Sequence, residues 1–147
     1  MQSLFRPIGL VACVVTMLVA CSRTTDEQAI RQALDDMTQA IEMKEPARLL
    51  DYVAMNFRGP ESMGRGDVRR MMAYQFTRNE NIKLFMTGLS IEVKGQQAHA
   101  RFHATLTGAL GLLPERLQYY AVDLEWWKDK KQWSVISADW QPVFGDQ

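Results

Sequence analysis

His99 and His103 are the only imidazoles in this 147-residue chain, and imidazole is a common metal ligand. Their spacing of four would place them on one face of a helix, but along a strand it separates them by about 13 Å. The apolar residues around them alternate, which favours a strand, so the two side chains lie too far apart to share an ion. We expect no metal site here, and we expect both histidines in a polar outer row with Glu92 and Arg101.

Nucleophilic and cofactor-dependent chemistry finds little support in the sequence. A serine or cysteine nucleophile needs a base within hydrogen-bonding reach, and the chain has no Gly-x-Ser-x-Gly elbow. The segment GPESMGRG contains glycines, but it lacks the lysine and the strand context of a phosphate-binding loop. The sequence predicts no cofactor.

Asp139 and Tyr120 are the candidates for acid–base catalysis. A two-residue turn at Asp129–Lys130 would pair Tyr120 with Asp139 and place both on the concave face of the sheet. A carboxyl group in an apolar cavity has a raised pKa and can act as a base or bind a polar ligand group. The alternative is a solvated pair at the strand ends, bonded to the helices or to water. The candidate ligand pocket comprises Tyr120, Val122, Leu124, Trp126 and Asp139.

The first twenty residues have the features of a secretory signal peptide. Arg6 is their only charged residue, and Ile8 to Ala20 is apolar apart from Gly9 and Thr16. These thirteen residues span only about 20 Å as a helix, short of the ~30 Å hydrocarbon layer of a membrane. A basic start followed by a short apolar run that ends in small residues is typical of a signal peptide.

The run ends in Leu18-Val19-Ala20-Cys21, which resembles the lipobox of bacterial lipoproteins. The resemblance implies cleavage before Cys21, a diacylglyceryl group on its thiol and acylation of its amine, as by palmitate. Three acyl chains would make a stable membrane anchor. Ser22 follows in place of an aspartate, which by the sorting pattern of such proteins implies the periplasmic side of the outer membrane. The alternatives are an ordinary secretion signal with a chance cysteine, or a core segment of a cytosolic protein.

Cleavage would leave 147 − 20 = 127 residues, enough for one domain. We therefore divide the chain into a signal peptide (1–20), a lipidated tether (21–25) and a domain (26–147). The cleaved chain has 16 basic and 17 acidic residues, and it has no nucleic-acid-binding signature. Five arginines near the third expected helix form either a solvated face or a contact with anionic headgroups: Arg58, Arg65, Arg69, Arg70 and Arg78.

Apolar residues at helical spacing predict three N-terminal helices. The first runs from about Asp26 to Met43, after a capping box of Thr25 and Gln28. The second begins at Pro46 and includes Val53 and Phe57 on its buried face, with Gly59-Pro60 as its end. The third is capped by Asp67 and carries its apolar face from Val68 to Phe76.

After residue 81 the apolar period changes to two, which predicts four antiparallel strands. A phase slip near Thr87-Gly88 indicates a bulge and a bent strand. A two-residue turn in Lys94–Gln97 then pairs Val93 with Ala98, Ile91 with Ala100 and Leu89 with Phe102. The next connection lies in Gly108–Glu115. The last two strands are Leu117–Trp127 and Trp133–Trp140.

This α+β order resembles the nuclear transport factor 2-like superfamily, which includes SnoaL-like cyclases and ketosteroid isomerases. The resemblance rests on DEQAIRQALDDMTQAIEMKEPARLL, on DLEWWKDKKQWSVISADW and on the order of elements. It implies a cone in which three helices pack on a bent, four-stranded antiparallel sheet, with a pocket at the wide end. It also implies a homodimer through the outer sheet face. We expect that face to carry Tyr119, Ala121, Asp123, Trp127, Ile136, Ala138 and Trp140. The alternative is a monomer in which the tail 141–147 folds back over the tryptophans.

Two functions therefore stand as hypotheses. The first is a non-catalytic, lipid-anchored module at the outer membrane, which binds a small apolar ligand or a protein. The second is a small enzyme of isomerase or dehydratase type that uses Asp139 and Tyr120. The sequence favours the first, because the second lacks another convincing polar group.

Overall fold

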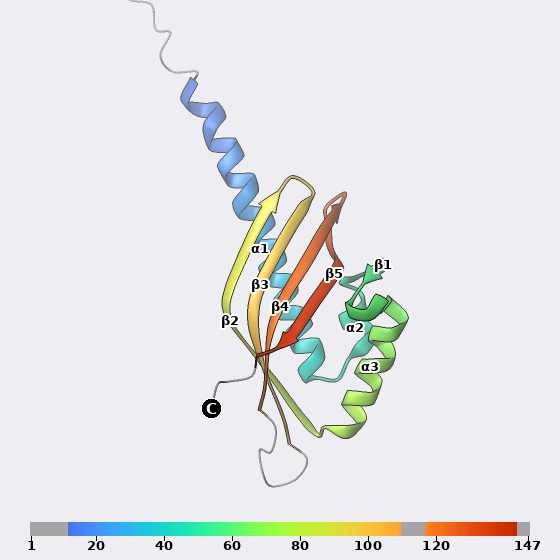
Figure 1. Cartoon of the computed structure of the whole chain (residues 1–147). Helices are drawn as coiled ribbons and strands as arrows, with labels where there is room; N and C mark the ends of the chain where they lie inside the picture. The colour runs from blue at the N-terminus through green and yellow to red at the C-terminus, as the bar shows by residue number, and fades with distance from the viewer. Residues whose placement is uncertain (1–11, 110–116, 144–147) are drawn as a thin grey trace, which may run out of the picture.

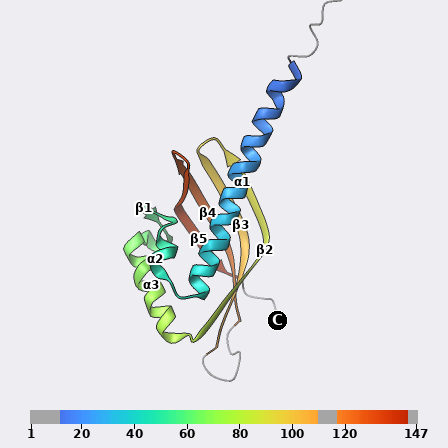
Figure 2. The same ribbon diagram turned by 180° about the vertical axis from the view of Figure 1, so that it is seen from behind.

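The structure is a computed structural model that describes residues 12–109 and 117–143, with the side chains of the first helix from Thr25 onward. The elements are α1 (Ala12–Glu42), α2 (Pro46–Leu50), β1 (Val53–Arg58), a 3₁₀ turn (Pro60–Ser62), α3 (Arg65–Arg78), β2 (Asn81–Lys94), β3 (Gln97–Ala109), β4 (Leu117–Asp129) and β5 (Gln132–Pro142). They form one sheet with strand order β1-β5-β4-β3-β2, in which only β1 pairs in parallel. The helices lie against one face of this sheet and leave the other face open (Figures 1 and 2).

The sheet has five strands and not the predicted four, because the second half of the predicted second helix forms β1. Helix α2 ends at Leu50, and Val53 and Phe57 are buried in β1. Their spacing of four residues matches the buried face of a helix. In a strand, two residues that are four apart also lie on one face, so the same spacing fits β1. The pairing of β1 with β5 is irregular between Val53 and Arg58. The parallel pairing also makes the sheet mixed.

Helix α1 begins at Ala12, so the prediction of a helix start at Asp26 was wrong for this chain. The helix continues through residues 21–25 without a break, and Thr25 lies inside it. No proline or glycine occurs between Ala12 and Glu42, and nothing else in that stretch stops a helix that has formed. Among the residues that the structure describes, no helix is both long enough and apolar enough to cross a membrane.

Helix α3 begins at Arg65, two residues before the predicted cap at Asp67. The N-cap is Gly64, and Asp67 accepts a hydrogen bond from the Gly64 backbone N–H at 2.9 Å. Arg65 donates to the backbone oxygens of Val53 and Leu50, at 3.0 Å each, and so joins α3 to the junction between α2 and β1. Asp67 therefore stabilises the start of α3 from a position inside the first turn, by accepting the hydrogen bond of the N-cap residue.

The bulge in β2 is confirmed. The pairing of β2 with β3 runs to Thr87 opposite His103 and resumes at Ser90 opposite Arg101. Gly88 has φ +66°, a conformation that costs other residues about 1–2 kcal/mol. The predicted pairs of Val93 with Ala98 and Ile91 with Ala100 are present, whereas Leu89 falls in the bulge and has no register partner. The connection predicted at Gly108–Glu115 lies mostly outside the described residues.

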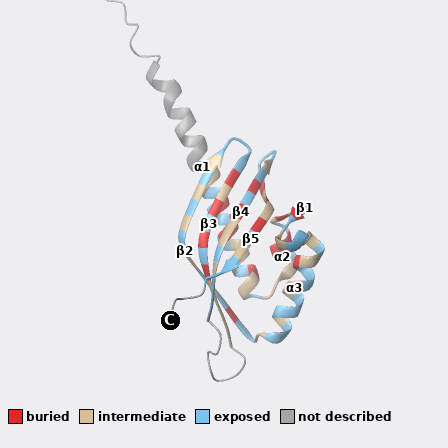
Figure 3. Ribbon diagram, in the orientation of Figure 1, coloured by how far each residue is buried: buried red, intermediate tan, exposed pale blue. Residues whose placement is uncertain are grey.

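One hydrophobic core fills the space between the helices and the inner sheet face (Figure 3). Alternate residues of the central strands point into it, as period-two patterning requires. Trp126 and Ala100 are fully buried. The inner face and α1 together contribute Ile30, Ala33, Leu34, Ala98, Ala100, Phe102, Ala104, Leu124, Trp126, Trp133, Val135 and Ala138.

The edge strand β2 is covered by Glu42, at the end of α1. The Leu84 backbone N–H donates to Glu42 Oε1 at 3.1 Å, and Lys83 Nζ donates to Oε2 at 3.0 Å. We expect Glu42→Ala to lower the free energy of unfolding by about 1.5 kcal/mol, because hydrogen bonds to a charged group are lost and an edge amide is exposed. Urea unfolding at pH 7 measures this loss.

The contribution of Glu42 should depend on pH. The Leu84 N–H and then Lys83 hold the pKa of Glu42 below its ordinary value of 4.5. The stabilisation is therefore fully present above pH 4.5 and is lost as the pH falls through the lowered pKa. We expect the difference in stability between the native chain and Glu42→Gln to shrink between pH 5 and pH 3. A difference that stays constant over that range would contradict this account.

Candidate functional site

The register between β4 and β5 differs from the prediction in two ways. The turn lies at Lys130-Lys131, one residue later than expected, so Asp129 pairs with Gln132. A bulge then follows, because Trp126 pairs with Val135 but Glu125 pairs with Ser137. This bulge adds Ile136 to one strand and reverses the facing of every later residue of β5. The sequence carried a signal for it, because the apolar residues shift from odd positions at Trp133 and Val135 to even positions from Ile136 onward. The prediction assigned these two sets to opposite faces of a regular strand.

The two catalytic candidates consequently lie on opposite faces of the sheet. Asp139 pairs with Asp123 on the outer face and is exposed, whereas Tyr120 pairs with Pro142 on the inner face. The Tyr120 hydroxyl donates to Gln118 Oε1 at 3.1 Å. The predicted pairing of Tyr120 with Asp139 was wrong.

The three other predicted pocket residues share the inner face of β4 and belong to or border the packed core. Leu124 and Trp126 are buried in the core, with 6% and 0% of their surface exposed. Val122 is partly buried beside the core, although it also borders a depression on the outer face. Ala138 and Trp140, which were expected on the outer face, lie on the inner face opposite Leu124 and Val122. The outer face is therefore less apolar than the sequence predicted.

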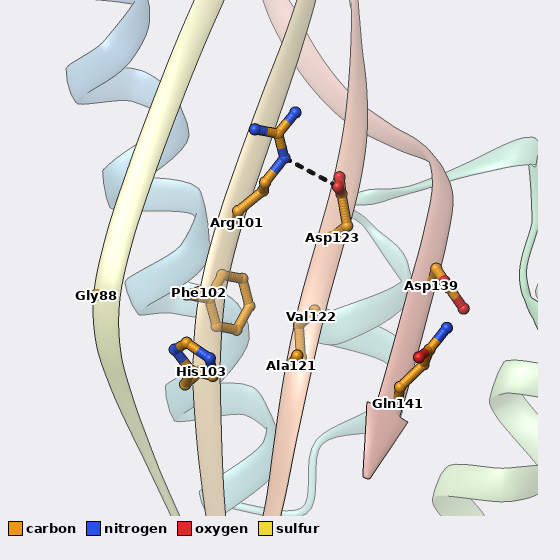
Figure 4. A pocket seen from close by; sticks show the side chains of 9 residues that line it. All are labelled: Gly88, Arg101, Phe102, His103, Ala121, Val122, Asp123, Asp139 and Gln141. Carbon is orange, nitrogen blue, oxygen red and sulfur yellow. Dashed lines mark hydrogen bonds and ion pairs between the residues drawn. The ribbon is translucent and has the colours of Figure 1, made fainter. Parts of the chain in front are cut away.

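A shallow depression of about 320 Å³ lies on the outer face over β2 to β5 (Figure 4). Gly88, at the bulge, has no side chain to fill it. Arg101 Nε donates to Asp123 Oδ2 at 3.0 Å at one end of the depression, and Asp139 and Gln141 line its β5 side. The complete lining is Gly88, Arg101, Phe102, His103, Ala121, Val122, Asp123, Asp139 and Gln141.

Both histidines lie on the outer face, as predicted. His99 is paired with Glu92 and has its Nδ1 3.7 Å from Asp123 Oδ1, while the His103 ring stacks on Tyr119 at a centroid distance of 5.3 Å. Within residues 12–109 and 117–143, no three His, Cys, Asp or Glu side chains are grouped to hold a metal ion.

The charged side chains that line this depression are in contact with solvent. The Arg101 and Asp123 side chains are 58% and 45% exposed, and a pair in such solvent contact contributes little energy. Asp139 is exposed too, so no apolar wall surrounds its carboxyl group. The depression can hydrogen-bond a polar surface, and the carboxyl and imidazole groups of Asp123, Asp139 and His103 that line it all contact solvent.

A second, larger groove of about 740 Å³ lies between β1 and the outer face of β4 and β5. Met55 of β1 is 84% exposed and Trp127 of β4 is 39% exposed, and Ile136 lies between these strands in the bulge. Asp51, Arg65 and Asp129 contribute charged groups to its lining. Half of the twelve lining residues are polar or charged, so the groove combines apolar surface with several polar groups.

The sequence reasoning missed this groove because it treated residues 53–58 as helix. The signal was present, since Val53, Met55 and Phe57 alternate with Ala54, Asn56 and Arg58. The buried pair Val53 and Phe57 fits a helical period equally well, and the following Gly-Pro ends either element. Nothing local to this segment indicated that β5 would accept it as a parallel neighbour.

Comparison with known proteins gives the fold. No family model matches the sequence, and no curated protein matches it. A candidate scytalone dehydratase from Novosphingobium aromaticivorans has a similar structure, with a TM-score of 0.76 and 15% identity, over 85% of this chain and 89% of that chain. A hexachlorocyclohexane dehydrochlorinase from Novosphingobium barchaimii gives a TM-score of 0.71 and 12% identity, over 85% and 91%.

An NTF2-like protein of unknown function from Pseudomonas putida gives a TM-score of 0.72 and 16% identity, over 83% of this chain and 89% of that chain. These similarities show that the chain has the nuclear transport factor 2-like fold, a fold that also serves dehydratases. Identities this low carry the fold alone, because one fold supports many functions.

Proposed function

We propose that this chain is a lipid-anchored, non-catalytic module on the periplasmic side of the bacterial outer membrane, which binds a small apolar ligand. The anchor part of the proposal is supported by Leu18-Val19-Ala20-Cys21 at the end of an apolar run, and the outer membrane by Ser22. The binding part is carried by one observation, the groove between β1 and the outer face, where Met55 and Trp127 expose apolar surface without a partner in the described chain.

The isomerase or dehydratase alternative is not proposed further. It required Asp139 and Tyr120 in one apolar cavity, and they lie on opposite faces of the sheet. The hexachlorocyclohexane dehydrochlorinase with a similar structure is 12% identical, so its similarity to this chain is one of fold alone.

The anchor is tested by replacing its cysteine. We expect Cys21→Ser to abolish incorporation of labelled palmitate completely, because the serine hydroxyl is not the thiol to which the diacylglyceryl group is transferred. Labelling in cells followed by membrane fractionation measures this, with Cys13→Ser as the matched control that should label normally. A Cys21→Ser protein that still takes up palmitate would remove the lipoprotein proposal.

The ligand is tested by native mass spectrometry of the full chain, extracted from its own cell in mild detergent. We expect an added mass from a bound apolar molecule, and we expect Met55→Lys to reduce its occupancy at least fivefold by placing a charge in the groove. Met43→Lys is the matched control, since Met43 is 63% exposed and does not line the groove. Equal occupancy in both variants would exclude the groove as the binding site.

Homodimerisation through the outer sheet face is a second proposal. Its support is now the aromatic pair of Phe85 and Tyr119, which are 57% and 37% exposed at the end of that face away from Trp127. Thr105 lies between them in register. Exposed aromatic residues are common anchors of protein interfaces. Sedimentation velocity of the detergent-extracted chain tests it, and a monomer at high micromolar concentration would exclude it.

A further inference from the structure

Helix α1 leaves the folded body at the end of the sheet where two hairpins turn (Figures 1 and 2). Asp26 fixes the helix there, because its Oδ1 lies 2.5 Å from Lys128 Nζ and 3.2 Å from Trp133 Nε1. Cys21 precedes Asp26 by five residues, or about 7.5 Å along a helix axis. An anchor at Cys21 would therefore hold this end of the domain within about 10 Å of the lipid surface.

The two turns form one continuous end, which we call the hairpin end: residues 94–97 and 128–131. The Lys128 backbone N–H donates to Gln96 O at 2.8 Å, and Gln96 Nε2 donates to Lys128 O at 3.4 Å. The bilayer would thus face a surface built from both turns.

Three lysines of the hairpin end are exposed: Lys94, Lys130 and Lys131. None of them forms an ion pair with any residue in the described part of the chain, and Asp129 is the one acidic residue in the two turns. A lysine near an anionic membrane strengthens binding about fivefold at low salt, and the effect fades over roughly 10 Å in 0.1 M salt. Only charged side chains that are held within about 10 Å of the bilayer gain from this attraction.

Arg78, at the C-terminal end of α3, is poorly placed for the same contact. Helix α3 lies beside the opposite part of the sheet and ends at Arg78, next to the start of β2 (Figure 1). Along β2, Lys94 is thirteen residues from Asn81, which is roughly 40 Å for an extended strand. The position of the anchor therefore disfavours headgroup contact by Arg78.

We propose that the hairpin end docks on anionic phospholipid headgroups through Lys94, Lys130 and Lys131. The inference rests on the proposed anchor at Cys21, and it adds an orientation to it: the outer and inner faces of the sheet stand away from the bilayer, with the hairpin turns toward it. The groove beside Met55 and Trp127 then opens near the lipid surface, since Gln97 and Asp129 belong both to its lining and to the hairpin end.

The test couples the full chain, carrying Cys13→Ser, through its remaining thiol at Cys21 to a maleimide lipid in vesicles. This attachment does not depend on acylation, so a failure of palmitate labelling in cells would refute the anchor without changing this measurement. Vesicles contain phosphatidylcholine alone or a 7:3 mixture with phosphatidylglycerol. Mass spectrometry follows the acetylation rate of each lysine.

We expect Lys94, Lys130 and Lys131 to be acetylated at least threefold more slowly on the anionic vesicles, with Lys44 unchanged and the difference abolished by 0.5 M NaCl. Hydrogen exchange at the Gly95 and Gln96 amides should slow in parallel. Replacing the three lysines with glutamine should remove that slowing, whereas the charge-matched variant Lys44→Gln/Arg69→Gln/Arg78→Gln should retain it. Equal acetylation on both vesicle types, or equal exchange in both variants, would overturn the docking proposal.

Discussion

Replacing Trp126 with alanine is expected to lower the free energy of unfolding by about 3–5 kcal/mol, the largest loss that we predict for a single residue. Trp126 is fully buried between the sheet and the helices, and its truncation leaves a cavity that the surrounding core can fill only in part. Its indole N–H has no acceptor in the described residues, so Trp126→Phe, which keeps most of the packing, should cost much less. Urea unfolding monitored by circular dichroism measures both variants.

The neighbouring residue provides the matched control. Trp127 lies on the outer face and is 39% exposed, so Trp127→Ala should cost no more than about 1 kcal/mol. Two adjacent tryptophans in one strand thereby test the direction of each side chain. Similar losses at the two positions would mean that the outer face is also covered, contrary to the arrangement described above.

Asp26→Ala is expected to lower the free energy of unfolding by about 2–3 kcal/mol. Asp26 accepts a hydrogen bond from Trp133 Nε1, and Trp133 is only 4% exposed. Loss of the Asp26 carboxylate therefore leaves the buried indole N–H without a partner. The same change removes the partner of Lys128, whose side chain is 25% exposed. Without these two contacts, the N-terminal half of α1 would no longer be held against the hairpin end. Backbone hydrogen exchange near Thr25 should therefore become faster.

Glu27→Ala is the control for this prediction, since it removes the next carboxylate along the same helix. Glu27 pairs with Arg31, and both side chains are nearly half exposed, so the expected loss is below about 0.5 kcal/mol. If Asp26→Ala cost no more than Glu27→Ala, the link between α1 and the β4–β5 hairpin would not be a source of stability.

Local patterns in the sequence were enough to predict an α+β order and four of the five strands. The phase slip around Gly88 predicted the bulge, and the turn around Gly95 set the register of β2 with β3. Both features depend on residues that are close in the chain, where side-chain alternation and turn chemistry act directly on the backbone. The alternation around His99 and Arg101 likewise identified the polar outer row.

The tertiary structure decided what depends on distant partners. Residues 53–58 became a strand because β5 offers a parallel edge, and no residue within that segment specifies such a neighbour. The bulge at Ile136 moved Asp139 to the outer face and Trp140 to the inner face, which separated the predicted catalytic pair. Alternation fixes which residues of one strand share a face, but the packing of Trp133, Val135 and Ala138 against the helices determines which face is buried on each side of a bulge.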